Sequence, residues 1–442
     1  MIYFNSVQRS ETMKRLLSLL LFLVIISIFF ITCQRRTNGG NAEAAQLKEI
    51  RVLLADHPYG NLIIPYIPEF EEKTGIKVIV EQLNESDITE RQVSNILTGA
   101  FTADVFMTRP MTETLLFLKN NWMEPLNDFD LTDYPPNTIE MGLRNDIPHY
   151  IPLVVEWQVL YYRKDLFRAA GLNVPSNFEE LENAARILNR SGISGFASRG
   201  AGSPAVSQVS SFIFGYGGRY IRNGAAAFNN PEALDAIRLY GRILGSYGPN
   251  GIGGMSWNEI LPIFQAGRLA MWTDASVFYG QLIDPENTQI PAENIGVGRL
   301  PRGPVTQQPY IVTSWGISIS SGTKDKDSSK KFLTWATSKE MAERAMLANI
   351  PMARISVWND PSVTTHINPE IVDTMIHASQ YGNPYPMPFM TSIVQGRNLI
   401  GEVITESIFT RGTSPRLQSL ASQKAAELNE LLKADGEYGT AK

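Results

Sequence analysis

The sequence is poor in residues that bind metals, form disulfides or attract nucleic acids. It has one cysteine, Cys33, so no disulfide framework can form within the chain. The formal charge is −5 and no basic cluster lies outside the N-terminal region, which argues against nucleic-acid binding. We expect no cofactor and no metal, because the four histidines are not spaced as a metal-binding pair on one helix face: His57, His149, His366 and His377.

The sequence also lacks the common catalytic signatures. It has no phosphate-binding loop and no Gly-x-Ser-x-Gly, and GIGGMS at 251–256 does not match a dinucleotide-binding fingerprint. A glycoside hydrolase remains open, because such an enzyme needs only two carboxylates about 5–5.5 Å or about 6.5–9.5 Å apart. Glu156 and Asp274 are the pair that this alternative would use.

The N-terminal region predicts export. Two basic residues precede an apolar run at 16–31, and the run is shorter than the roughly 20 residues of a membrane-spanning helix. This favours a cleaved signal at 1–33 over a retained membrane anchor. The position of Cys33 just after the run resembles a bacterial lipoprotein signal, in which that cysteine becomes the lipidated first residue. Residues 34–46 are small and polar, and they predict a flexible tether.

The rest of the chain has the pattern of an α/β protein. Two β-branched runs, EIRVLLA at 49–55 and IKVIVEQL at 76–83, flank a helical segment that stops at Gly75. Strands and helices continue to alternate, which predicts parallel sheets covered on both faces. Capping boxes are expected where a serine precedes a glutamate by three positions: Ser176 with Glu179, and Ser256 with Glu259.

A carboxylate lies in a stretch that otherwise reads as a buried strand. LAMWTDASVF at 269–278 follows a helix and a stop at Gly267, so 269–273 is predicted to be a strand. An unpaired carboxylate in such an environment costs on the order of 2–7 kcal/mol or more. Asp274 must therefore be paired or face a cleft, unless it caps a helix that starts at Ala275.

Four blocks of sequence carry a family resemblance: IPLVVEWQVLYYRKDLFRAAGLNVPSNFEELENAARIL (151–188), FQAGRLAMWTDASVF (264–278), SWGISISSGTKDKDSSKKFLTWATSKE (314–340) and IPMARISV (350–357). They resemble the extracellular solute-binding proteins of sugar ABC importers, and within that family the sorbitol/mannitol-type polyol-binding branch. The resemblance implies a two-lobe periplasmic-binding-protein fold of the type II kind, with an α/β core in each lobe and crossing hinge strands between them. Lobe 1 would comprise 47–155 and 301–352, and lobe 2 would comprise 156–300 and 353–442.

The resemblance also implies a set of ligand-binding residues in the cleft. Carboxylates and guanidinium groups make charge-assisted hydrogen bonds with sugar hydroxyls, and indoles cover the apolar C–H faces of a sugar. Each residue has a structural alternative: a core position for the tryptophans, an ion pair for Glu156 and the arginines, and a helix cap for Asp274. The set is Glu156, Trp157, Arg199, Trp272, Asp274, Trp315 and Arg354.

These features predict an exported, lipid-anchored, monomeric binding protein without catalytic activity. We expect it to capture a sugar or polyol between two closing lobes and to deliver it to an ABC permease. Two alternatives stay open: a secreted glycoside hydrolase that uses Glu156 and Asp274, and a sensory ligand-binding subunit of a chemoreceptor.

Overall fold

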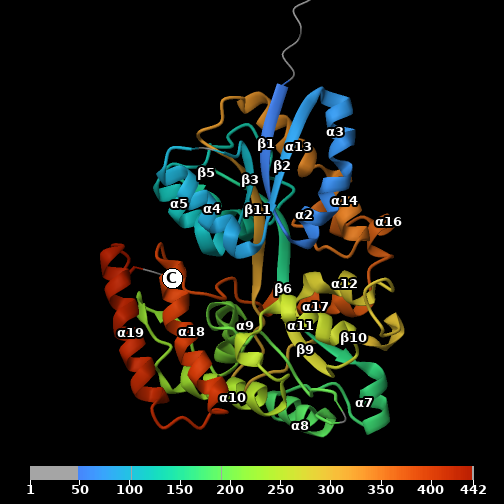
Figure 1. Ribbon diagram of the computed structural model, residues 1–442, viewed down its shortest axis with the longest axis vertical. Helices are drawn as coiled ribbons and strands as arrows, with labels where there is room; N and C mark the ends of the chain where they lie inside the picture. The colour runs from blue at the N-terminus through green and yellow to red at the C-terminus, as the bar shows by residue number, and fades with distance from the viewer. Residues whose placement is uncertain (1–47, 101, 191, 441–442) are drawn as a thin grey trace, which may run out of the picture. The chain divides into compact units, whose positions relative to one another are not determined.

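The computed structural model describes residues 48–100, 102–190 and 192–440, and these residues form a compact unit with two lobes (Figure 1). One sheet runs through the unit, with the strand order β10-β6-β11-β3-β1-β2, and β9 also pairs with β6. The bounds of these strands are β1 Lys48–Ala55, β2 Ile76–Leu83, β3 Val105–Thr108, β6 Ile151–Arg163, β9 Met271–Ala275, β10 Ile295–Arg299 and β11 Ile311–Ile319. The short pairs are β4 Leu143–Arg144 with β5 Ile147–Pro148, and β7 Ile221–Arg222 with β8 Ala225–Ala226.

The first lobe opens with the β-α-β arrangement that the sequence predicts. Strands β1 and β2 are parallel, and the helix between them ends at Gly75, whose φ of +68° suits a residue without a side chain. Strand β3 is also parallel to β1, so the carboxyl ends of all three strands lie at the same edge. The helices of this lobe are α2 Pro58–Ile63, α3 Ile67–Thr74, α4 Glu85–Leu97, α5 Leu115–Lys119, α6 Pro136–Ile139, α13 Lys326–Ala336, α14 Lys339–Leu347, α15 Ile355–Trp358 and α16 Pro361–Thr364.

The second lobe is built on β9, β10 and the distal half of β6, and it is largely helical (Figure 1). The capping box at Ser256 and Glu259 is confirmed, because both of its hydrogen bonds are present. The other expected box is wrong by one residue, since Asn177 is the N-cap and the helix starts at Phe178, whose ring is buried against Phe212. The helices are α7 Lys164–Ala170, α8 Phe178–Leu188, α9 Gly202–Gly215, α10 Pro231–Tyr247, α11 Trp257–Gln265, α12 Tyr279–Ile283, α17 Pro369–Tyr381, α18 Ile393–Phe409 and α19 Leu417–Ala434.

The long strand β6 belongs to both lobes. Its first half pairs antiparallel with β11, from Ile151 opposite Ile317 to Trp157 opposite Ile311. Its second half pairs with β9 and β10. The segment at Met352 also lies beside β6, since it forms a bridge with Val154. Side chains of β6 therefore reach both lobes, and those on one face point into the space between them.

The strand that follows Gly267 starts later than expected. Leu269 pairs only with Ser194 in an isolated bridge, and regular pairing with β6 begins at Met271, so β9 ends at Ala275 and contains Asp274. Among the described residues, no helix is both long enough and apolar enough to cross a membrane. Cys33 and the predicted signal and tether lie outside the described residues.

Candidate functional site

A cavity of about 600 Å³ lies between the lobes. It opens into a larger space of about 1540 Å³, and the two share Glu85, Arg109, Thr112, Arg199 and Arg397. We call the two together the interlobe cleft. Helix α4 and the segment after β3 line it from the first lobe, α9 and α18 line it from the second lobe, and β6 and β11 form its floor.

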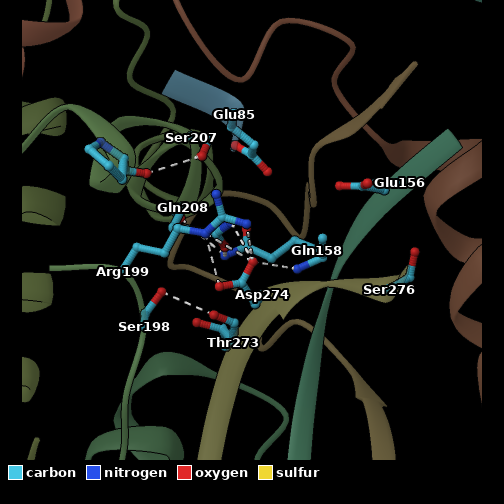
Figure 2. Close-up of polar contacts among 12 residues, drawn as sticks. Glu85, Glu156, Gln158, Ser198, Arg199, Ser207, Gln208, Thr273, Asp274 and Ser276 are labelled. Atoms are coloured by element: carbon cyan, nitrogen blue, oxygen red, sulfur yellow. Dashed lines mark hydrogen bonds and ion pairs between the residues drawn. The ribbon is translucent and has the colours of Figure 1, made fainter. Parts of the chain in front are cut away.

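Asp274 is paired with Arg199 at the floor of this cleft. Arg199 Nη2 lies 2.7 Å from Asp274 Oδ1, and Arg199 Nε lies 3.1 and 3.0 Å from the two carboxylate oxygens. Figure 2 shows the guanidinium group over the carboxylate. Asp274 is completely buried, whereas the side chain of Arg199 is 12% exposed. The ion pair therefore supplies the partner that the buried carboxylate requires, and Arg199 is the member of the pair that lines the cleft.

A hydrogen-bond network holds the pair in place. Gln208 Nε2 donates to Asp274 Oδ1 and to the hydroxyl of Tyr310, both at 3.1 Å, and the Ala275 amide donates to Asp274 Oδ1 at 2.8 Å. Burial opposes the charge on Arg199, but the Asp274 carboxylate outweighs it, so the pKa of Arg199 is raised. Burial raises the pKa of Tyr310, and the negative charge of Asp274 raises it further. The hydroxyl of Tyr310 therefore stays protonated in the cleft wall.

Glu156 is held by a histidine with a defined tautomer. The amide of Tyr59 donates to His57 Nδ1 at 3.3 Å, so the ring proton lies on Nε2 and is donated to Glu156 Oε1 at 3.1 Å. The His57 ring also contacts Trp315, with their centroids 5.6 Å apart. The second carboxylate oxygen of Glu156 has no protein donor among the described residues and lines the cleft, where it can accept a hydrogen bond from a ligand.

The first lobe contributes a second charged group. Arg109 is bonded through Nε to the buried Glu113 at 3.3 Å, and its Nη1 lies 3.5 Å from Glu85 Oε2. Burial acts to raise the pKa of Glu85, but Arg109, Arg199, His57 and Arg397 together lower it. A lowered carboxyl pKa despite burial means that the electrostatic potential at this end of the cleft is positive.

The structure brings four of the seven predicted ligand-binding residues together. Glu156, Arg199 and Trp315 line the cleft, and Asp274 lies directly beneath Arg199. Trp157 follows Glu156 on the same strand and therefore points to the other face of β6. There it donates from Nε1 to Thr374 Oγ1 at 3.0 Å and lines an apolar cavity of about 1250 Å³.

Trp272 and Arg354 also lie away from the cleft lining. The indole of Trp272 is completely buried and stacks on Phe278, which in turn stacks on Trp257. It is Trp257, at the start of α11, that reaches the cleft. Arg354 is ion-paired with Asp133 on the first lobe and does not line either part of the cleft.

Sequence reasoning missed most of the cleft lining, including six charged, amide or aromatic side chains. Glu85 and Arg109 directly follow the carboxyl ends of β2 and β3, and the rule that ligands bind at these ends could have indicated them. Trp257 follows the capping serine of α11, and no local signal marks the other three. The six are Glu85, Arg109, Gln208, Trp257, Tyr310 and Arg397. No cluster of His, Cys, Asp or Glu suited to a metal ion occurs among the residues that the structure describes.

Comparison with known proteins agrees with this architecture. The model of the bacterial extracellular solute-binding protein family matches residues 55–343. A mannitol-binding protein of Pseudomonas aeruginosa is 30% identical over 284 residues, which are 61% of this chain and 65% of that protein, so the match spans just under two thirds of the relative. An erythritol/L-threitol-binding protein of Mycolicibacterium smegmatis is 25% identical over 355 residues, 71% of this chain and 72% of the relative.

Solved structures share the fold. An ABC transporter solute-binding protein from Agrobacterium radiobacter, in complex with ribitol, superposes with a TM-score of 0.78 at 22% identity over 87% of this chain and 98% of that one. Another from Agrobacterium vitis, with bound D-mannitol, has a TM-score of 0.77 at 20% identity over 88% and 99% of the two chains. The family model covers more than half of the sequence, and the protein therefore belongs to the bacterial extracellular solute-binding proteins.

Proposed function

We propose that the protein is the substrate-binding component of an ABC importer and that it binds a sugar or polyol in the interlobe cleft. The observation that carries the proposal is the composition of the cleft wall, where polar groups from both lobes converge with aromatic rings. The mannitol-binding and erythritol/L-threitol-binding relatives, and the neighbours that hold ribitol and D-mannitol, support a polyol as the substrate.

The wall suits a molecule with many hydroxyl groups. Each hydroxyl donates one hydrogen bond and accepts others, and the cleft offers an acceptor in Glu156 and donors in Arg199 and Tyr310. Trp315 and Trp257 offer apolar faces to the C–H surfaces of a sugar. In this proposal Asp274 acts through Arg199, which it holds in a fixed orientation.

Binding would stabilise the closed arrangement of the lobes. We propose lobes of 47–155 with 301–352 and of 156–300 with 353–442, except that α15 and α16 pack with α14 and so belong to the first lobe. A ligand that contacts both lobes at once favours the closed form, because those contacts exist only when the lobes are together. The closed form is what the permease would recognise.

The proposal extends to the location of the protein. Membership of an extracellular family agrees with the export signal read from the sequence. In our proposal residues 1–33 direct export, Cys33 carries a lipid anchor and the body is a monomer that returns its ligand chemically unchanged. The completely buried and paired state of Asp274 supports a role other than that of a catalytic carboxylate.

A thermal-shift screen of polyols, monosaccharides and disaccharides on the protein without residues 1–33 tests the proposal. A ligand at 100 times its dissociation constant adds about 2.7 kcal/mol to the free energy of unfolding, which is a measurable rise in melting temperature. The responsive compound should be recovered intact after prolonged incubation. The absence of a response to any carbohydrate or polyol would contradict the proposal, and so would turnover of the ligand.

A further inference from the structure

Arg397 is a cation without an anionic partner in the interlobe cleft. It lies on α18 and lines both parts of the cleft. Its Nε and Nη2 donate to one backbone oxygen, that of Ser203, at 3.2 and 2.9 Å. Among the described residues no carboxylate forms an ion pair with Arg397, whereas Arg199 has Asp274 and Arg109 has Glu113. Within the described part of the chain, Arg397 is therefore the one guanidinium group of the three without a carboxylate at ion-pair distance, and Glu85 and Glu113 act on it only from farther away.

The electrostatic surroundings of Arg397 also favour an anionic ligand. Burial and the neighbouring Arg109 lower the pKa of Arg397 to about 10, and Glu85 and Glu113 oppose this effect without cancelling it, so the protein around Arg397 disfavours its charge. Glu85 lines both parts of the cleft beside these arginines, but its ion pair is with Arg109, at 3.5 Å. The pKa values of Glu85 and Arg397 are both lowered, and both changes indicate a positive potential at this end of the cleft.

The opposite end of the cleft has a different character. Glu156 presents a carboxylate oxygen there, and Tyr310 and Gln208 are neutral hydrogen-bonding groups. A second anionic group near Glu156 would be repelled, whereas hydroxyl groups would be bound. Three exposed carboxylates line only the larger, outer space: Asp56, Asp87 and Glu90. In its inner part the cleft therefore has a cationic group at Arg397 and Arg109 and a hydroxyl-binding group at Glu156.

We propose that the ligand is a sugar acid, a polyhydroxy chain or ring with one carboxylate, and that Arg397 binds this carboxylate while the hydroxyl groups lie toward Glu156. The inference rests on the proposed function and narrows its substrate class. A bidentate guanidinium–carboxylate pair is geometrically specific, and in a partly buried site it is stronger than a hydrogen bond between neutral groups. Arg397 is then the residue that distinguishes acidic from neutral polyhydroxy compounds.

Calorimetric titration of the purified chain with a matched pair of ligands tests this inference. D-Mannonate differs from D-mannitol only in having a carboxylate in place of one terminal hydroxymethyl group. We expect D-mannonate to bind at least tenfold more tightly, which corresponds to one charge-assisted contact. We also expect the ratio of the two affinities to fall as the salt concentration rises, because a partly exposed ion pair is screened.

A substitution assigns the effect to the residue. Arg397→Gln removes the charge and retains a donor, and it should lower the affinity for D-mannonate at least tenfold more than the affinity for D-mannitol. The matched control is Arg186→Gln on the exposed surface of α8, where the same change should affect neither affinity. If Arg397→Gln does not fold, the salt dependence of the two affinities in the unmodified chain still tests whether an ion pair with the carboxylate of D-mannonate contributes to binding.

The outcomes separate this inference from the proposed function. If the chain binds D-mannitol as tightly as D-mannonate, or more tightly, the acidic ligand is wrong while the binding of polyols stands. Tighter binding of mannitol 1-phosphate than of D-mannonate would assign the cationic group at Arg397 and Arg109 to a phosphate and overturn the carboxylate. If the chain binds no polyhydroxy compound, neutral or acidic, the proposed function fails, and the inference fails with it.

Discussion

Asp274→Asn is the substitution whose consequences the structure defines best. The change removes one negative charge and keeps the size of the side chain. If the amide oxygen of the introduced asparagine took the place of Oδ1, it would still accept from Gln208 and Ala275, but its NH2 group would then lie where Oδ2 is, 3.0 Å from Arg199 Nε. A donor would face a donor, and Arg199 would lose its only carboxylate partner among the described residues.

The expected loss of stability follows from burial. Removing one partner of a buried ion pair costs about 3–5 kcal/mol, because the remaining charge is left uncompensated. Unfolding entropy of about 2.1 cal/mol/K per residue amounts to roughly 0.8 kcal/mol/K for the unit Lys48–Lys442, so the melting temperature should fall by about 4–6 °C. A side chain that only capped a helix would behave differently, since asparagine caps about as well as aspartate.

Differential scanning calorimetry without ligand measures this loss, and the chain offers a matched control. Asp373 forms a similar two-point pair with Arg299, at 2.6 and 2.9 Å, but both side chains are about half exposed. Asp373→Asn should therefore cost at most about 1 kcal/mol.

A double substitution tests the cause. Adding Arg199→Met to Asp274→Asn removes both charges, and it should recover at least half of the lost stability because no unpaired charge remains. The reasoning is refuted if Asp274→Asn costs no more than Asp373→Asn, or if Arg199→Met destabilises the Asp274→Asn protein further.

Other predictions concern pH, the anchor and the remaining predicted site residues. Burial and Arg299 lower the pKa of His377, so below the ordinary histidine pKa of about 6.5 the unfolded chain binds more protons than the folded chain. The contribution of His377 to stability should thus be fully present above that pH and be lost below it. On acidification the melting temperature should therefore decrease less in His377→Gln than in the parent protein, and equal decreases would contradict this. Cys33→Ser should move the protein from the membrane fraction to the soluble fraction with ligand affinity unchanged, whereas continued membrane attachment would favour a retained helix. Arg354→Met should lower the melting temperature through loss of the Asp133 pair and leave the dissociation constant within about threefold, because the guanidinium group lies outside the cleft; a tenfold loss of affinity would place it at the ligand. Glu156→Gln should weaken ligand binding about tenfold to a hundredfold, and chromatography should show the ligand unchanged with either protein; product formed by the parent alone would identify a hydrolase.

Local patterns in the sequence were sufficient for the α/β architecture, but the expectation of parallel sheets holds only for β1, β2 and β3, because β6 is antiparallel to β9, β10 and β11. The β-branched runs, the stop at Gly75 and the capping box at Ser256 each depend on a few neighbouring residues, and all three are present in the structure. The requirement that Asp274 be paired or face a cleft also followed from the sequence, because it rests on the cost of burying a charge and on no knowledge of the fold.

The identity of the partners depended on the tertiary structure. Arg199 is 75 positions from Asp274 in the sequence, and only the bridge between Ala197 and Trp272 brings the two side chains together. The resemblance placed Trp272 in the cleft, but the ring of Phe278 separates it from Trp257, which lines the cleft.

The same limit explains Trp157 and Arg397. The sequence shows that neighbours on a strand point to opposite faces, but it does not show which face of β6 meets the cleft, and so Glu156 and Trp157 were predicted together. Arg397 looks like any polar residue on a helix, and only the packing of α18 against α9 places it in the cleft opposite Arg109. The sequence by itself determined the elements and the need for a partner, because these depend on local conformation and solvation. Which residues meet at the site was decided by the packing of segments distant in the sequence.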